Sequence, residues 1–221
     1  MTTVTPGTLL VDWDNTLHDA AGTFFGALRH VLADRGIRLD VPMYRAAYDP
    51  DYRVLYARLG VPDDEIDAAS DAWRVLVRQA TPRLIAGSRE ALERIRDARV
   101  PVHVVTAAPR EQVEAQLAAT GVGWLAAIVA GGEADAPRPA AAPLQMALQR
   151  IGGGTAPVVY AGDTPADMLM ALAAGVRAIG IAGFATSEAQ LRAAGAQETA
   201  PSFSAWAERW LGGLVERPVL G

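Results

Sequence analysis

Five short apolar runs alternate along the chain with stretches whose apolar residues have helical spacing. The runs are TLLVD (8–12), PVHVVT (101–106), AAIVA (126–130), PVVYAGD (157–163) and VRAIGI (176–181). The helical patterns lie at about 87–99, 109–120, 139–151, 164–174 and 186–194. Apolar runs without polar alternation, separated by helices, predict an α/β fold with a parallel sheet covered on both faces. In such sheets ligands bind at the carboxyl ends of the strands.

One long segment interrupts this alternation. Residues 18–82 contain helical patterns only, at about 20–35, 51–59 and 62–80, and Pro42, Pro50, Pro62 and Pro82 separate them. We therefore predict a core domain of residues 1–17 and 83–221, with residues 18–82 inserted after the first strand as a small helical cap. The alternative is a single continuous domain.

Composition narrows the class of protein. Hydrophobic residues make up 51% of the chain and charged residues 20%, which is typical of a folded globular protein. The net charge of −5 disfavours nucleic acid and anionic membranes as partners. No apolar run has the length of a membrane span, and the first residues lack the basic start of a signal peptide, so we expect a cytoplasmic protein. The chain has no cysteine, and all 20 of its basic residues are arginine.

Two pairs of aspartates follow apolar runs. Asp12 and Asp14 come two residues apart after the first run, and Asp163 and Asp167 come four apart after the fourth. These spacings place each pair on one face of a strand or helix. Each residue alone could be a turn residue or a helix cap. Two different strands that both end in paired acids instead suggest a site for a hard cation, and Mg²⁺ fits best because it takes few carboxylates and leaves room for phosphate.

A third run also ends in a polar residue. Thr106 closes the second strand, and Pro109 begins a helix, so the hydroxyl group and the backbone N–H groups of the loop, including that of Ala107, could bind an anion. The alternative for Thr106 is a helix cap. His103 lies within the same apolar strand and is interpreted as a core histidine with its hydrogen bonds satisfied.

These motifs, in this order, resemble those of the haloacid dehalogenase-like (HAD) superfamily, in the subgroup similar to phosphoglycolate phosphatases, which has a Rossmann-like core and a small helical cap. DWDNTLHDA resembles the first motif, Thr106 stands at the second, and GDTPADMLMALAAGV resembles the fourth. There are two departures. Asn15 replaces the usual glycine, and tolerates left-handed backbone angles nearly as well. At the third motif, DAPRPAAAPLQMAL has Arg138 where the family has lysine.

The resemblance implies a role for each residue. Asp12 would be the nucleophile and Asp14 the general acid and base. Mg²⁺ would be held by Asp12, Asp14 through its backbone carbonyl, and Asp163, with Asp167 in support. The phosphoryl oxygens would be bound by Thr106, Ala107 and Arg138. Arg45, Tyr48 and Arg53 of the cap would select the substrate; exposed helix faces and packing are the alternative for these three.

The expected function is a Mg²⁺-dependent phosphatase that hydrolyses a small organic phosphate monoester, such as phosphoglycolate or a sugar phosphate, through a phosphoaspartyl intermediate. Within the superfamily that the chain resembles, dehalogenases lack the second aspartate of the first motif, so Asp14 disfavours that branch. Phosphonate hydrolases of the superfamily form a Schiff base on a lysine, which this chain lacks. Two alternatives stay open: a phosphosugar mutase on the same core, and a weakly active or inactive phospholigand-binding protein in which Arg138 does not replace the lysine. The expected partner is a small phosphorylated metabolite, and the expected assembly is a monomer or a homodimer.

Overall fold

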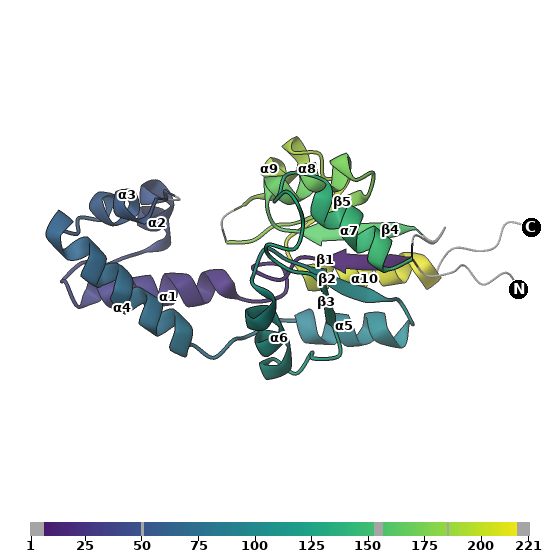
Figure 1. The fold of residues 1–221 in the computed structure, drawn as a ribbon, viewed down its shortest axis with the longest axis horizontal. Coiled ribbons are helices and arrows are strands. Elements are labelled where there is room, and N and C mark those ends of the chain that lie inside the picture. Colours follow the sequence, from purple (N-terminus) through teal and green to yellow (C-terminus); the bar gives the residue numbers. More distant parts are fainter. Residues whose placement is uncertain (1–6, 50, 153–156, 185, 216–221) are drawn as a thin grey trace, which may run out of the picture. The chain divides into compact units, whose positions relative to one another are not determined.

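The computed structural model describes residues 7–49, 51–152, 157–184 and 186–215. The chain divides into two compact units, one made of Met1–Asp19 with Arg83–Gly221 and the other of Ala20–Pro82. The first is an α/β unit and the second is helical (Figure 1). In the part of the chain that the structure describes, no helix combines the length and the apolar character needed to cross a membrane.

A parallel sheet forms the centre of the α/β unit. Its strands are β1 (Thr8–Val11), β2 (Val102–Val105), β3 (Ala126–Val129), β4 (Val158–Gly162), β5 (Arg177–Ile181) and β6 (Glu198–Ala200), arranged in the order β3-β2-β1-β4-β5-β6. Leu10 of β1 lies opposite His103 of β2 and Tyr160 of β4. The strand order reverses between β1 and β4, which makes their carboxyl ends the switch point where such sheets bind ligands. The predicted α/β fold is confirmed.

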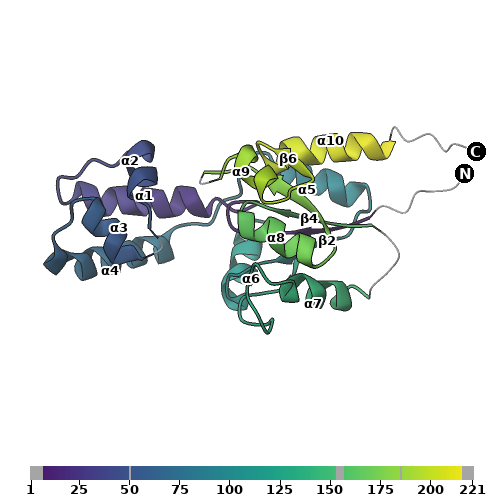
Figure 2. The ribbon, with the colours of Figure 1, turned by 90° about the horizontal axis from the view of Figure 1, so that it is seen from above.

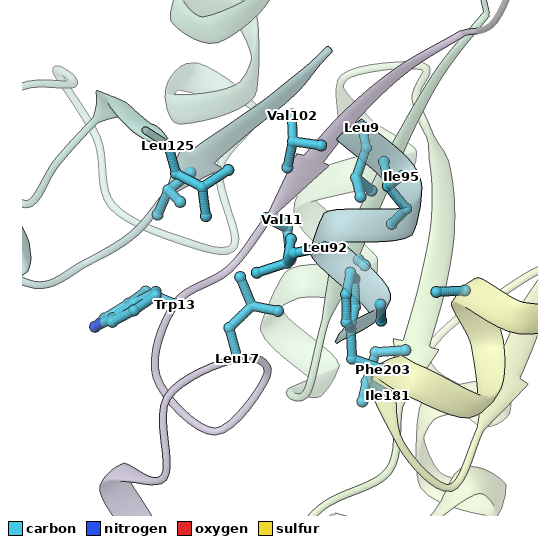
Figure 3. Close-up of a cluster of buried hydrophobic side chains, with 14 of the residues drawn as sticks. Leu9, Val11, Trp13, Leu17, Leu92, Ile95, Val102, Leu125, Ile181 and Phe203 are labelled. Atoms are coloured by element: carbon cyan, nitrogen blue, oxygen red, sulfur yellow. The ribbon is translucent and has the colours of Figure 1, made fainter. Parts of the chain in front are cut away.

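Helices cover both faces of this sheet. One face carries α5 (Ser88–Asp97), α6 (Arg110–Ala119) and α10 (Phe203–Val215), and the other carries α7 (Ala142–Arg150), α8 (Pro165–Ala173) and α9 (Glu188–Ala193). Figure 2 shows α10 and α7 on opposite sides of the strands. Successive residues of β1 point to opposite faces. Leu9 therefore belongs to the same buried cluster as Leu92 and Phe203 (Figure 3), whereas Leu10 packs in the cluster of the other face.

The helical unit has its own apolar core. It consists of α1 (Ala20–Ala33), α2 (Val41–Ala47), α3 (Tyr52–Arg58), the short 3₁₀ helix η1 (Asp63–Glu65) and α4 (Ile66–Gln79). Its buried side chains include Leu28, Leu32, Tyr56, Leu59 and Ile66. The unit therefore buries apolar surface around a centre separate from the two clusters of the sheet.

Three elements of the structure were absent from the sequence prediction. β6 has only three residues, Glu-Thr-Ala, at the edge of the sheet, and so lacks an apolar run. α2 is seven residues long, too short to show periodicity, and is stabilised by the Asp40 side chain, which accepts a hydrogen bond from the backbone N–H of Met43. α10 contains two adjacent glycines, which weaken its helical signal.

One prediction about a core residue was wrong in part. His103 is half-buried in β2, but its Nδ1 atom has no hydrogen-bond partner among the described residues. Burial lowers the pKa of this imidazole, since the charged form is the one that loses most by leaving water. The neutral ring is therefore favoured at this position.

Candidate active site

The carboxyl ends of β1 and β4 bring two aspartates together that are far apart in the sequence. Asp12 follows β1 directly, and its backbone N–H continues the ladder by donating to the carbonyl oxygen of Ala161 in β4 at 2.8 Å. Asp163 follows β4 directly, and Asp167 lies in the first turn of α8. Because β1 and β4 are hydrogen-bonded neighbours, these residues meet at the switch point of the sheet.

The three carboxylates form a close, buried group. Asp12, Asp163 and Asp167 each offer an oxygen atom, and these atoms lie within 4.8 Å of one another. The Oδ1 atom of Asp163 is buried and has no hydrogen-bond partner among the described residues. An unpaired buried carboxylate oxygen is costly unless a cation or a donor occupies the place beside it. The donor set is therefore suited to a hard cation with oxygen ligands, such as Mg²⁺.

The acidity of the group is perturbed by its surroundings. Burial raises the pKa of Asp163 from 3.8 to about 8, and the nearby charges of Asp12 and Asp167 act in the same direction. Burial also raises the pKa of Asp12 to about 7, although the Arg138 guanidinium opposes this effect. Both shifts have the same cause, which is that the anionic form is disfavoured away from water and beside other anions. A bound cation would favour the ionised form of both residues.

Arg138 is the positive charge inside this group. Its Nη2 atom donates to Asp12 Oδ1 at 2.7 Å, and its Nη1 atom donates to Asp12 Oδ2 at 3.0 Å and to Asp167 Oδ1 at 2.6 Å. The planar guanidinium group donates two parallel hydrogen bonds to one carboxylate, a bidentate geometry that an ammonium group cannot adopt. Burial disfavours the charge, but Tyr160, Asp12 and Asp167 outweigh it and raise the pKa of Arg138. Arg138 therefore lies charged at the site, mostly buried beside Asp12.

Asp167 connects the site to the start of α8. Its Oδ2 atom accepts hydrogen bonds from the backbone N–H and the hydroxyl group of Thr164, while Thr164 caps the helix in return. Its Oδ1 atom accepts from Arg138 and from the hydroxyl group of Tyr160 at 2.8 Å. Thr164 and Asp167 thus form a capping box at the start of α8, and Asp167 has a second contact with the site through Arg138.

Glycine at position 162 makes room for this arrangement. A Cβ atom at Gly162 would lie 2.7 Å from both Cβ and Cγ of Asp167. Any side chain there would push the Asp167 carboxylate away from Arg138 and Tyr160.

Asp14 lies outside the group of three carboxylates. Its Oδ1 atom instead lies 2.8 Å from Nδ1 of His18. Asn15 has a φ of 61°, in the left-handed region that asparagine tolerates better than most residues. Of the four aspartates in the two predicted pairs, the structure therefore brings the side chains of three together, and the side chain of Asp14 contacts His18 instead.

The loop after β2 places Thr106 and Ala107 at the same edge of the sheet. Thr106 is buried, and its hydroxyl oxygen accepts a hydrogen bond from the backbone N–H of Ala108 at 3.1 Å. The helix-cap interpretation of Thr106 is wrong, because α6 has Pro109 at its N-cap. Ala107 is exposed, and its carbonyl packs against Gly131, where a Cβ atom would lie 2.1 Å from that oxygen.

The predicted specificity residues all lie in the helical unit. Arg45 and Tyr48 are exposed, and the Tyr48 ring centre lies 5.8 Å from that of Tyr44. Arg53 donates through Nη2 to both carboxylate oxygens of Asp67 at 2.6 Å. The charge of Arg53 is thus already paired within its own unit, which favours the alternative of an exposed helix face for this residue. Substrate selection by these residues stays a prediction.

Two contacts of the site were not anticipated from the sequence. The first is the contact of His18 with Asp14, and its only sequence signal is the spacing of four residues between them. The second is the hydrogen bond from Tyr160 to Asp167. Its only signal is the alternation of side chains along β4, which turns Tyr160 to the face of the sheet that α8 covers. Both signals are common in chains without such a contact, so neither is specific by itself.

Comparison with known proteins identifies the family and the fold of the chain. Residues 9–181 match the family described as haloacid dehalogenase-like hydrolase. A phosphoglycolate phosphatase of Xanthomonas campestris is 31% identical over 188 residues, which cover 79% of this chain and 82% of the relative. A haloacid dehalogenase-like family hydrolase from Streptococcus pneumoniae has the same fold, with a TM-score of 0.70 at 20% identity, over 96% of this chain and 99% of that one. CbbY from Rhodobacter sphaeroides, solved in complex with phosphate, has a TM-score of 0.60 at 22% identity, over 90% of this chain and 96% of that one. The chain with its Asp12, Arg138 and Asp163 site therefore belongs to the haloacid dehalogenase-like hydrolases.

Proposed function

We propose that this hydrolase is a Mg²⁺-dependent phosphatase that cleaves a small organic phosphate monoester through a phosphoaspartyl intermediate on Asp12. The observation that carries the proposal is the juxtaposition of Asp12, Arg138 and the unpaired oxygen of Asp163 at the switch point of the sheet. The name of the Xanthomonas campestris relative supports a small phosphorylated acid such as phosphoglycolate as the substrate.

Asp12 is the nucleophile in this proposal. One of its oxygen atoms attacks phosphorus, the bond from phosphorus to the ester oxygen breaks, and hydrolysis is divided into two displacements. Arg138 holds the carboxylate by a two-bonded fork, so the attacking oxygen starts from a defined position. The contacts of Arg138 with Asp12 and Asp167 use three of the five N–H groups of a guanidinium. Arg138 can therefore donate to the phosphoryl oxygens of the substrate while it keeps its hydrogen bonds to Asp12 and Asp167.

Asp14 is the general acid and base. It protonates the leaving ester oxygen in the first displacement and takes a proton from the attacking water in the second. The side chain of Asp14 is 32% exposed, so water can reach it. Thr106 and the backbone N–H of Ala107, at the end of β2, are proposed to bind phosphoryl oxygens.

Mg²⁺ would be held by Asp163, Asp12 and the backbone carbonyl of Asp14. When bound, it supplies positive charge that offsets the repulsion between an anionic carboxylate and an anionic phosphate. The contribution of Asp167 is proposed to be indirect, because each of its oxygen atoms already accepts two hydrogen bonds from the protein. Each oxygen atom of Asp12, in contrast, accepts one hydrogen bond from Arg138.

A substrate panel tests the proposal. Purified protein is assayed for phosphate release from p-nitrophenyl phosphate, phosphoglycolate and several sugar phosphates, with Mg²⁺ and with EDTA. We expect turnover that requires Mg²⁺, and a loss of about 10³-fold or more in Asp12→Asn, because the nucleophile is removed. Asp97→Asn, at an exposed position in the last turn of α5, is the matched control and should retain the wild-type rate.

Two outcomes would contradict the proposal. Turnover that survives Asp12→Asn would show that another group carries the chemistry. An absence of turnover across the panel, with phosphate binding retained, would favour a phospholigand-binding protein in which Arg138 does not support catalysis.

A further inference from the structure

The segment from Trp13 to His18 is wound into a tight loop. The carbonyl oxygen of Trp13 accepts hydrogen bonds from the backbone N–H groups of both Leu17 and His18, at 3.0 and 2.9 Å. The backbone N–H of Asn15 donates to the carbonyl oxygen of His18 at 2.7 Å. Three backbone hydrogen bonds within six residues place the His18 side chain next to that of Asp14.

The His18 ring is held on a rigid support. It stacks on the Trp13 ring with 5.4 Å between centres and 7° between planes, and His18 is 4% exposed. Trp13 is fully buried, and its Nε1 atom donates to Gln116 Oε1 at 2.8 Å. The backbone beside His18 is also held, because the N–H of Ile85 donates to the Leu17 carbonyl oxygen at 2.8 Å. The imidazole therefore has little freedom to move.

Asp14, in contrast, has a partly exposed side chain. Its Oδ1 atom lies 2.8 Å from Nδ1 of the fixed ring, at hydrogen-bond distance. A contact to a buried ring selects one orientation of the carboxylate out of those that a half-exposed aspartate samples. With Oδ1 held in this way, Oδ2 is the oxygen that can exchange a proton with a substrate or with water.

We infer that His18 is a positioning residue for the general acid Asp14, an inference that rests on the proposed function. In the first displacement the O–H bond of protonated Asp14 breaks, the proton passes from Oδ2 to the ester oxygen, and the electron pair of the broken P–O bond stays on that oxygen. The nucleophile Asp12 forms the new bond to phosphorus. His18 contributes no proton in this step. It keeps Asp14 in the orientation from which the proton is delivered.

Leaving groups of different basicity separate this role from a general structural one. An alkyl phosphate such as glycerol 2-phosphate needs a proton on its leaving oxygen, whereas p-nitrophenolate leaves without one. The ratio of kcat/KM for the alkyl substrate to kcat/KM for the aryl substrate therefore reports how much proton donation by Asp14 accelerates the first displacement. The ratio does not depend on how much of a variant is folded, because both substrates are assayed on the same sample.

Two variants divide the contacts of the ring. His18→Phe keeps an aromatic ring on Trp13 but removes the atom that contacts Asp14. His18→Asn places an amide nitrogen where Nδ1 stood but removes the ring. We expect His18→Phe to lower the alkyl-to-aryl ratio by about 10- to 100-fold, in the range of the loss that a misplaced catalytic group causes. His18→Asn should restore most of the ratio, and Asp14→Asn should lower it further still.

The outcomes distinguish this inference from the proposed function. If wild-type protein turns over both substrates and His18→Phe keeps the wild-type ratio, His18 does not position Asp14, while the proposed function stands. Equal losses on both substrates in His18→Phe and His18→Asn would likewise assign the ring a packing role only. If wild-type protein turns over neither these two substrates nor any other member of the panel, the proposed function fails and the inference fails with it.

Discussion

Asp163→Asn should stabilise the metal-free protein although it damages the candidate metal site. The substitution keeps the shape of the side chain and replaces a buried carboxyl group, whose ionised form would lie beside Asp12 and Asp167, by a neutral amide. The pKa of Asp163 is raised from 3.8 to about 8 in the folded protein, mainly by burial. That difference corresponds to a cost of ionisation in the folded state on the order of 6 kcal/mol.

The sign of the pH dependence follows from the direction of this shift. Below pH 3.8 Asp163 is protonated in both the folded and the unfolded chain and costs nothing. As the pH rises toward 8 the unfolded chain releases the proton while the folded chain retains it, so the wild-type protein loses stability. The advantage of Asp163→Asn should therefore be absent near pH 4, grow with pH, and level off above about pH 8.

Urea unfolding in EDTA at several pH values between 4 and 9 measures this advantage as a difference in the free energy of unfolding. Asp97→Asn, at an exposed position, serves as the control and should show a small effect at every pH. Addition of Mg²⁺ should then stabilise the wild-type protein, because the ion binds the folded state, and should stabilise Asp163→Asn much less. Equal stability of Asp163→Asn and wild type in EDTA at pH 8 would refute the argument, and so would an equal response of both to Mg²⁺.

Two further predictions concern the neighbours of this carboxylate. Arg138→Met should lower the free energy of unfolding in EDTA at pH 8 by about 3–5 kcal/mol, because Asp12 and Asp167 lose a buried counter-charge. The same substitution made in Asp12→Asn should cost less, and equal costs in both backgrounds would show that the fork does not couple the two residues. Gly162→Ala should lower both phosphatase activity and the free energy of unfolding, the latter by about 1–3 kcal/mol, since its methyl group overlaps Asp167. Retention of the wild-type activity and melting temperature in Gly162→Ala would contradict the close packing at this position.

The elements that could be predicted were those with a strong local pattern. β1, β2, β4 and β5 are almost continuous apolar runs, and a buried parallel strand needs that composition on both of its faces. β6 was missed because an edge strand of three residues is defined by pairing with β5 rather than by its own residues. α2 was missed because its stability comes from the Asp40 cap and from packing in the helical unit.

The residue chemistry of the site was visible in the sequence, whereas most of its contacts were not. Asp12 and Asp163 could be placed together because parallel strands deliver their carboxyl ends to one edge of a sheet. The partner of Asp14 could not be assigned, since whether its side chain joins the other acids or turns to His18 depends on the backbone angles of a short loop. The perturbed pKa values of Asp12 and Asp163 depend on burial, which is a property of the packed molecule.

By itself, the sequence determined the alternation of strands and helices, the positions of the acidic residues at strand ends, and the presence of an arginine at position 138. Only the tertiary structure decided what that arginine does. Arg138 stands 126 residues after Asp12, and packing around the switch point brings its guanidinium group onto both oxygens of the Asp12 carboxylate. The physical reason is that local patterns determine local elements, while the contacts of a buried charge depend on every segment that excludes water from it.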